Sequence, residues 1–191
     1  INRAVDTAKK AAASRSTVLL LGESGTGKEI FARAIHNWSD RKDKPFVAIN
    51  CVGLSKELLE SELFGHEKGA FTGALQLKKG KMELAHGGTV FFDELSETSE
   101  SVQARLLHVL ETRRYRRVGG TSDLSMGARV ISATNRLPDA GGIDGLRPDL
   151  YFRVAGITLT VPPLRDRIDD VPVLAEHFLK LLGRQVPGVP K

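Results

Sequence analysis

The sequence predicts an α/β fold built on a parallel five-stranded sheet flanked by helices, and three observations lead to this class. Residues 17–21 form an apolar run that is followed by a glycine-rich turn and by a segment whose apolar residues recur at helical spacing. Helix-like segments also separate the later apolar runs, and such alternation is typical of a parallel sheet covered on both faces. These further runs, which we expect to be strands, lie at residues 46–50, 89–92, 128–134 and 157–161.

The segments between the apolar runs predict the helices. Residues 99–112 carry their apolar side chains on one face, as an amphipathic helix does. Residues 65–80 are punctuated by glycine, and residues 137–149 are loop-like. The other expected helices lie at residues 1–15, 29–38, 56–64, 81–85 and 171–182.

The composition of the 191-residue chain is that of one globular domain, or of a domain with a small appendage. The net charge of +5 suits an anionic ligand or nucleic acid, although this charge is mild. The lone Cys51 excludes an internal disulfide, and neither a signal peptide nor a membrane-length apolar run is visible. We therefore expect a cytoplasmic protein without membrane contact. The chain begins at Ile1 without a methionine, and we expect it to be an excised domain.

The glycine-rich turn matches the pattern G-x-x-x-x-G-K in the strand–turn–helix setting where this pattern binds nucleotide phosphates. Glycines let consecutive backbone N–H groups point at an anion, and the N-terminus of the following helix adds its dipole. Lys28 would place a cation on the outer phosphates; the alternative is a glycine-rich turn with an unrelated lysine. Glu29 replaces the Ser or Thr that usually ligates magnesium, so a metal must depend on other residues. The candidate phosphate-binding residues are Gly22, Glu23, Ser24, Gly25, Thr26, Gly27, Lys28 and Glu29.

Polar side chains follow or end three of the predicted strands. Asp93 is placed to hold the magnesium that bridges the β- and γ-phosphates, directly or through water. Glu94 could orient and deprotonate the attacking water, and the alternative for both acids is a cap on the next helix. Asn135 could detect the γ-phosphate, and Asn50 could hold the Glu94 carboxylate aside until it is needed. Either asparagine could instead be a turn residue.

Seven motifs occur in order along the chain: GESGTGKE, the asparagine of FVAINC, ELFGHEKGAFTGA, GGTVFFDEL, RVISATNR, RPDLYFR and VPPLRDRIDD. With these motifs the chain resembles the central AAA+ ATPase domain of the bacterial enhancer-binding proteins that activate sigma-54 RNA polymerase. The resemblance covers nearly the whole chain. Most of the motifs are generic for AAA+ proteins, whereas GAFTGA is close to a signature of this family. The family also carries Glu after the phosphate-loop lysine, in agreement with Glu29.

The resemblance implies an AAA+ P-loop NTPase that binds ATP and Mg²⁺, hydrolyses ATP and remodels the sigma-54 holoenzyme to activate transcription. It implies a homo-oligomeric ring, expected to be a hexamer, and DNA binding through a domain outside this chain. It also divides the chain into an ATPase core at residues 1–163, with a sigma-54-contacting insertion at 65–80, and the truncated start of a helical lid at 164–191. The family's nucleotide-contacting lid arginine is not assigned to any residue here.

The resemblance implies that a loop tip contacts sigma-54. The residues themselves are consistent with this role, because two glycines give mobility and Phe71 has no obvious core periodicity. An exposed aromatic side chain is costly unless a partner buries it, and the alternative is that Phe71 folds back into the core. A second loop, within residues 113–123, would support the first. The tip consists of Gly69, Ala70, Phe71, Thr72, Gly73 and Ala74.

The resemblance also implies that Arg147 and Arg153 reach the γ-phosphate of a neighbouring subunit, where their charge would stabilise the transition state. A head-to-tail ring places each active site at a subunit boundary. The alternative is a surface pair with Asp149. Leu146 stands where the family usually has Phe, so the geometry of these arginines stays open.

A second class of function stays open as well. The chain could be a nucleic-acid motor or loader of the wider AAA+ class. The GAFTGA motif favours the sigma-54 function over this alternative. The nucleic-acid patch would then consist of Tyr115 with Arg113, Arg114, Arg116 and Arg117.

Overall fold

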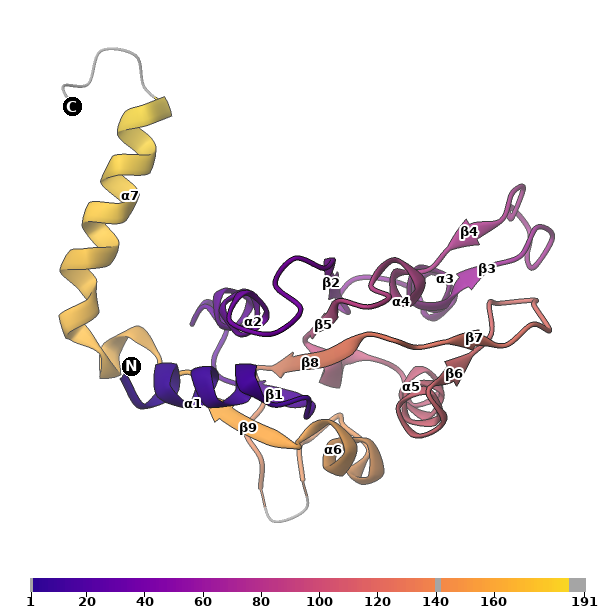
Figure 1. Cartoon of the computed structure of the whole chain (residues 1–191), viewed down its shortest axis with the longest axis horizontal. Coiled ribbons are helices and arrows are strands. Elements are labelled where there is room, and N and C mark those ends of the chain that lie inside the picture. Colours follow the sequence, from indigo (N-terminus) through magenta and orange to yellow (C-terminus); the bar gives the residue numbers. More distant parts are fainter. Residues whose placement is uncertain (1, 140–141, 186–191) are drawn as a thin grey trace.

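A five-stranded sheet forms the centre of the fold in the computed structural model, which describes residues 2–139 and 142–185 (Figure 1). The strands stand in the order β2-β5-β8-β1-β9, and every neighbouring pair is parallel. Each strand lies within one residue of its predicted bounds, so the predicted fold class is confirmed. The strands are β1 (Val18–Leu21), β2 (Phe46–Asn50), β5 (Thr89–Asp93), β8 (Arg129–Thr134) and β9 (Ile157–Thr160).

Helices cover both faces of this sheet. One face packs against α1 (Asn2–Ala13) and α2 (Lys28–Asn37). The other face packs against α3 (Lys56–Phe64), α4 (Lys81–Leu84), α5 (Glu100–Thr112) and α6 (Pro148–Val154). After β9, the 3₁₀ turns η2 (Leu164–Asp166) and η3 (Ile168–Asp170) lead into α7 (Val171–Gln185). A third 3₁₀ turn, η1 (Leu95–Glu97), follows β5.

The helix α6 corrects the sequence prediction, because it begins inside the segment that was expected to be loop-like. Pro148 occupies the first turn, where its missing N–H has no helical partner to lose, and Asp149 lies near the positive end of the helix dipole. Leu150 and Val154 lie four residues apart and are both buried. A helix of 7 residues has too few turns for apolar periodicity to reveal it. Packing against the core, rather than local pattern, stabilises α6.

Two small hairpins, which the sequence did not predict, extend from the same end of the molecule (Figure 1). The first pairs β3 (Gly65–His66) with β4 (Lys78–Lys79), and the second pairs β6 (Arg114–Tyr115) with β7 (Leu124–Ser125). A bridge between His66 and Val118 joins the two hairpins. Strands of 2 residues are too short to show an alternating apolar pattern.

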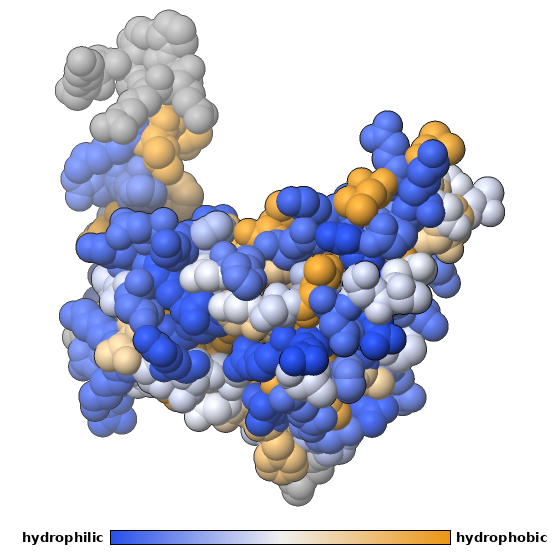
Figure 2. Space-filling model, turned by 45° about the vertical axis from the view of Figure 1, so that its right-hand side comes forward, coloured by the Kyte–Doolittle hydropathy of each residue, from blue (hydrophilic) through white to orange (hydrophobic). Residues whose placement is uncertain are grey.

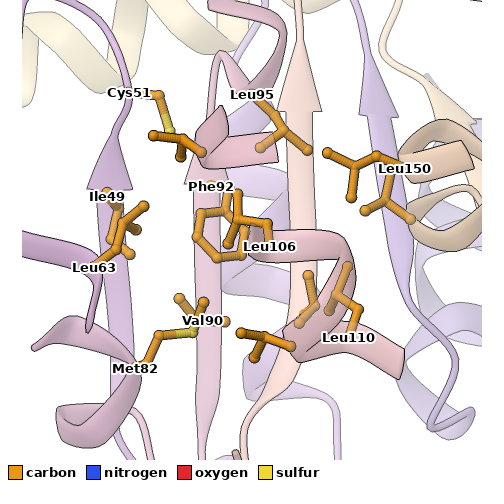
Figure 3. Close-up of a cluster of buried hydrophobic side chains, with 14 of the residues drawn as sticks. Ile49, Cys51, Leu63, Met82, Val90, Phe92, Leu95, Leu106, Leu110 and Leu150 are labelled. Atoms are coloured by element: carbon orange, nitrogen blue, oxygen red, sulfur yellow. The ribbon is translucent and has the colours of Figure 1, made fainter. Parts of the chain in front are cut away.

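The strand β1 is buried along its whole length and anchors the core on both faces. Successive side chains of a strand point to opposite faces, so Leu19 and Leu21 join the cluster beneath α3 to α6. Val18 and Leu20 join the cluster beneath α1 and α2. Figure 3 shows the first cluster, with Phe92 of β5 near its centre. Each fully buried leucine or phenylalanine contributes about 1.5–3 kcal/mol, so the carboxyl end of β1 is a rigid base for the turn that follows.

The helix α7 projects from the core (Figure 1), and Figure 2 shows apolar surface along it. Phe178 is 57% exposed and Leu179 is 70% exposed. Among the described residues, no helix is long and apolar enough to cross a membrane. The predicted boundary between a core at residues 1–163 and a lid from residue 164 stays a prediction.

Candidate functional site

The glycine-rich turn connects the carboxyl end of β1 to the N-terminus of α2. Gly27 is the residue before the helix and has a left-handed φ of 95°, which glycine adopts without steric cost. At Gly22 the constraint is space, because a Cβ atom would lie 2.7 Å from the carbonyl oxygen of Val161. The glycines therefore set both the curvature of this turn and its close approach to the end of β9.

Lys28 folds back over this turn, which we call the phosphate loop (residues 22–28). Its side chain is 5% exposed, and its Nζ donates a hydrogen bond of 2.8 Å to the carbonyl oxygen of Gly22. The same Nζ lies 3.2 Å from Oε1 of Glu94, whose side chain is 14% exposed. The lysine thus connects the phosphate loop to the acids at the end of β5.

Glu94 has an unusual backbone conformation and a fully engaged carboxylate. Its φ of 54° lies in the left-handed region, which a non-glycine residue adopts at a cost of about 1–3 kcal/mol and which is often found at functional sites. Its Oε2 accepts a hydrogen bond of 2.8 Å from the backbone N–H of Asn135. Glu94 therefore bridges Lys28 and the end of β8.

Asp93 lies beside Glu94 at the carboxyl end of the sheet. Burial, and then the charge of Glu94, raise the pKa of the Asp93 carboxyl above its ordinary range. The same acids act on Cys51, because burial, followed by repulsion from Asp93 and Glu94, raises the pKa of its thiol to about 12. Lys28 acts in the opposite direction and balances part of this negative charge, so a further cation could still be bound at this edge of the sheet.

Seven of the predicted residues line a pocket of about 200 Å³. Among the described residues, no group of three or more acidic, histidine or cysteine side chains forms a metal cluster. Magnesium in nucleotide sites is usually held by one or two carboxylates together with phosphate oxygens and water, so Asp93 and Glu94 fit such an ion. Glu29 is instead paired with Arg33 at 2.8 Å. The pocket is lined by Ser24, Gly25, Gly27, Lys28, Glu29, Asp93 and Glu94.

Asn50 does not make the predicted contact with Glu94. It lies beside Asp93 in the sheet register, but its Oδ1 accepts a hydrogen bond of 2.9 Å from the backbone N–H of Val52. Such a bond to the second residue along the chain is typical of asparagine in a turn. The partner that holds Glu94 is the main chain of Asn135, which the sequence placed near the phosphates through its side chain.

Two arginines after β9 contact the phosphate loop and were missed by the sequence analysis. Arg165 donates to both carboxylate oxygens of Glu23, and its Nη1–Oε2 distance is 2.8 Å. Arg167 donates from Nη2 to the carbonyl oxygen of Thr26 at 2.7 Å. The motif VPPLRDRIDD contains both arginines, but no spacing rule indicates that they reach a turn 141 residues away.

The tip at residues 69–74 forms a compact turn outside the core. The N–H of Gly69 bonds to the carbonyl of Ala74 at 2.8 Å, and the N–H of Ala74 bonds to the carbonyl of Phe71 at 3.0 Å. Phe71 is 42% exposed, and its ring meets the ring of His66 edge-on at a centroid distance of 5.0 Å. Phe71 thus rests on the hairpin base without entering the core.

The second loop lies directly against the first. The N–H of Val118 donates to the carbonyl of Gly65 at 2.9 Å, and the N–H of Glu67 donates back to Val118 at 3.0 Å. Arg117 is paired with both Glu67 and Glu83, each at 2.8 Å, and its side chain is only 14% exposed. This part of the chain therefore buttresses the base of the tip.

The same contacts disfavour an open nucleic-acid patch. Tyr115, the aromatic residue of the candidate patch, is buried against Phe64, and burial raises the pKa of its hydroxyl to about 12. Arg116 is paired with Asp123 at 2.6 Å, and Arg117 is committed to the two glutamates. The buried Tyr115 ring is therefore not offered as a stacking surface, although the Arg116 side chain stays 57% exposed.

Arg147 and Arg153 both lie on or beside α6 but take different positions. Arg147 is paired with Asp149 at 2.7 Å, which is the alternative contact considered from the sequence. Arg153 donates to the carbonyl of Leu110 at 2.9 Å, and its own carbonyl accepts from Thr17, which precedes β1. The phosphate loop follows the opposite end of β1, so the structure does not bring Arg153 to the pocket of its own chain.

Gln103 is a further positioning residue that the sequence analysis missed. It is 1% exposed, and its Nε2 donates to the carbonyls of Thr98 and Gly145. Its Oε1 accepts from the backbone N–H of Arg147 at 2.8 Å. A buried amide that satisfies three main-chain groups fixes the start of α6. In the sequence, only the position of Gln103 on an apolar helix face could have indicated this role.

Comparisons with known proteins agree with this geometry. The sequence model of the family described as "Sigma-54 interaction domain" matches residues 1–160. The chain is 56% identical over 172 residues to a Nif-specific regulatory protein of Herbaspirillum seropedicae, covering 90% of this chain and 32% of that protein. It is 52% identical over 186 residues to a Nif-specific regulatory protein of Azorhizobium caulinodans, covering 97% of this chain and 30% of that protein. The chain thus spans about a third of the length of these relatives.

Solved structures with a similar fold include NtrX from Brucella abortus. Its complex with ADP has a TM-score of 0.87 at 34% identity and covers 100% of this chain and 42% of that one. Its complex with ATP has a TM-score of 0.86 at 35% identity, covering 97% and 42%. The five-stranded sheet with its flanking helices is therefore an AAA+ fold that binds adenine nucleotides in a solved relative.

Proposed function

This chain belongs to the sigma-54 interaction domain family, and from that premise we propose that it is an ATP-hydrolysing motor that remodels sigma-54 RNA polymerase holoenzyme to activate transcription. The observation that carries the proposal is that one chain combines a pocket around Lys28, Asp93 and Glu94 with an exposed aromatic tip at Phe71. The pocket suits a nucleoside triphosphate, and the tip suits a protein partner.

The pocket residues divide the chemistry of hydrolysis between them. The N–H groups of the phosphate loop and the Nζ of Lys28 bind the phosphates of ATP. Asp93 would hold Mg²⁺, which would supply neutralisation of the phosphate charge. Glu94 orients the attacking water and accepts its proton.

Both carboxylate oxygens of Glu94 are engaged, one by Lys28 and one by the Asn135 N–H. A γ-phosphate that attracts Lys28 would release Oε1 of Glu94 to the water. Hydrolysis would then depend on the arrival of the substrate. The change in the contacts of Glu94 would also alter the structure at the ends of β5 and β8.

The route from the pocket to the tip is short and continuous. Asn50 is the register partner of Asp93, and α3 begins 6 residues later at Lys56. Leu59 and Leu63 bury one face of α3, and the helix runs directly into Gly65 of the tip hairpin. A displacement at the end of β2 or β5 would therefore be transmitted to the tip through α3.

Oligomerisation is part of the proposal. Arg153 lies near the amino end of β1, away from its own phosphate loop, so it can serve an active site only as a neighbour. We expect a ring, most simply a hexamer, in which Arg147 exchanges its pair with Asp149 for the neighbour's γ-phosphate. DNA contact would come from a domain outside this chain.

Sigma-54 capture tests the output function directly. The wild-type protein, Phe71→Ala and the control Trp38→Ala are compared in a pull-down with sigma-54 and a transition-state analogue of ATP. Trp38 is a suitable control because it is an aromatic residue that is 48% exposed and lies at the end of α2, outside the tip. We expect Phe71→Ala alone to lose capture, since an apolar anchor supplies much of the energy of a small interface. Equal capture by all three proteins would contradict the proposal.

A further inference from the structure

We propose that Arg165 and Arg167 are positioning residues that tie the segment after β9 to the phosphate loop and hold this loop in the conformation that receives ATP. The proposal rests on the nucleotide site proposed above. It concerns residues outside the pocket, which act on ATP through Glu23 and Thr26.

The two segments run alongside each other through a series of contacts. The first is the close approach between Val161 and Gly22, where the N–H of Val161 also donates to the carbonyl of Leu21 at 2.7 Å. The second is the ion pair of Arg165 with Glu23, and the third is the bond from Arg167 to Thr26. The three contacts follow the same order along both segments. They therefore form one continuous line of contact, which we call the seam.

Arg165 has an electrostatic effect on the loop. Glu23 is the one carboxylate within residues 22–28, and it would repel the phosphates of ATP. The hydrogen bonds and the charge of Arg165 lower the pKa of the Glu23 carboxyl, which stays ionised but is paired. Arg165 thus neutralises the charge that opposes anion binding.

Arg167 has a geometric effect. Its side chain is 13% exposed, and its Nη2 bonds to a main-chain carbonyl of the loop rather than to a mobile side chain. Its Nε is buried without a hydrogen-bond partner among the described residues. Such burial of a donor is unfavourable and must be offset by the other contacts of the guanidinium. Nη1 lies 3.7 Å from Oδ2 of Asp170 in the same segment, and the bond to Thr26 is the contact that reaches the phosphate loop.

The seam also connects the loop to α7. Arg165 lies in the turn η2, and Arg167 lies between η2 and η3; η3 continues directly into α7 at Val171. A change in the direction of α7 would therefore pull on Glu23 and Thr26. The affinity for ATP and the orientation of the projecting helix are expected to depend on each other.

A double-mutant cycle tests the ion pair. The dissociation constant for ATP is measured by titration calorimetry for wild type, Arg165→Ala, Glu23→Ala and the double variant, all in the full chain. We expect Arg165→Ala to weaken binding about fivefold, the upper end for an exposed pair, and to have no further effect once Glu23 is replaced. The same weakening in both backgrounds, or none in either, would overturn the proposal. Arg165→Lys should restore part of the affinity.

Two further measurements separate positioning from a general loss of structure. Arg15→Ala is the matched control, because Arg15 is also an exposed arginine paired with an aspartate, Asp40, but it precedes β1 at the other end. It should bind ATP as wild type does. Hydrogen exchange in nucleotide-free Arg167→Ala should become faster in residues 162–170 and 22–28. Unchanged exchange would contradict the proposal that Arg167 ties these two segments together. Unchanged ATP affinity in Lys28→Ala would refute the proposed nucleotide site, whereas the exchange result does not depend on that site.

Discussion

The Nζ of Lys28 lies 3.2 Å from Oε1 of Glu94, and both side chains are largely buried. This ion pair joins the phosphate loop to the acidic end of β5, the two parts of the proposed ATP site. A buried pair is costly to break from one side, because the remaining charge is left without its partner. Substrate phosphates that take over Lys28 would remove this obstacle, so the pair makes the release of Glu94 dependent on nucleotide.

Lys28→Ala should abolish ATP binding. The substitution removes the cation that contacts the outer phosphates, while the glycines that shape the loop remain. Titration calorimetry measures the affinity, and circular dichroism checks that the fold persists. Lys9→Ala, at an exposed position on α1, serves as the control and should bind normally. An unchanged affinity in Lys28→Ala would rule out the predicted role of this lysine.

Glu94→Gln should bind ATP but hydrolyse it at least about a hundredfold more slowly, the lower end for a lost acid–base group. Glutamine keeps the size and the acceptor for the Asn135 N–H but cannot take a proton from water. Steady-state release of phosphate measures the rate. Glu97→Gln changes a nearby acid that is paired with Arg136 and should retain near-normal turnover. Near-normal turnover in Glu94→Gln would instead assign Glu94 to a structural cap.

Asp93→Asn should stabilise the fold at neutral pH while abolishing hydrolysis. The pKa of Asp93 is raised from 3.8, so the unfolded chain loses this proton first and stability falls as the pH rises through the interval between the two values. Asparagine removes this penalty above the interval and should change the melting temperature little below it. Thermal melts at neutral pH and below pH 3.8 test the effect.

Asp123→Asn provides a control of opposite sign. Hydrogen bonding to Arg116 lowers the pKa of Asp123, so its ionisation contributes stability above pH 3.8 that is lost as the pH falls through the lowered value. Asp123→Asn should therefore lower the melting temperature slightly at neutral pH. A lower melting temperature for Asp93→Asn as well would contradict the argument from burial.

Arg117→Ala should weaken sigma-54 capture without changing ATP affinity. The substitution leaves Glu67 and Glu83 unpaired at the base of the tip and should lower the free energy of unfolding by about 1–3 kcal/mol. Arg116→Ala is the neighbouring control, because its pair with Asp123 is exposed to solvent and contributes little to stability. Denaturant unfolding and the pull-down measure the two effects, and equal effects of both variants would argue against a buttress.

Arg153→Ala and Glu94→Gln subunits should complement each other in a protein long enough to form the ring. Each variant alone is expected to be nearly inactive, because an arginine that reaches the γ-phosphate contributes about a thousandfold or more in rate. In a mixture, an intact Glu94 can meet an intact Arg153 across a boundary, and random assembly would give about a quarter of the sites. Specific activity of wild type should also rise with concentration. An inactive mixture would mean that Arg153 does not act on a neighbour.

The sequence by itself determined the sheet and the centre of the site. Buried strands appear as short apolar runs, and the phosphate loop as glycines around Lys28, because both depend on the conformation of a few consecutive residues. Asp93 and Glu94 could be placed near that loop since parallel strands end at one edge of the sheet. Topology alone therefore brings Lys28, Asp93 and Glu94 together.

Only the tertiary structure decided which groups hold these residues. The main chain of Asn135, rather than the side chain of Asn50, engages Glu94, and Arg165 reaches Glu23 across 142 residues. Asn50 bonds locally because its own turn offers an N–H two residues away at no cost in chain closure. A hydrogen bond requires its atoms to lie within a few tenths of an ångström of about 2.9 Å, and that distance is set by the packing of distant segments, which no local pattern encodes.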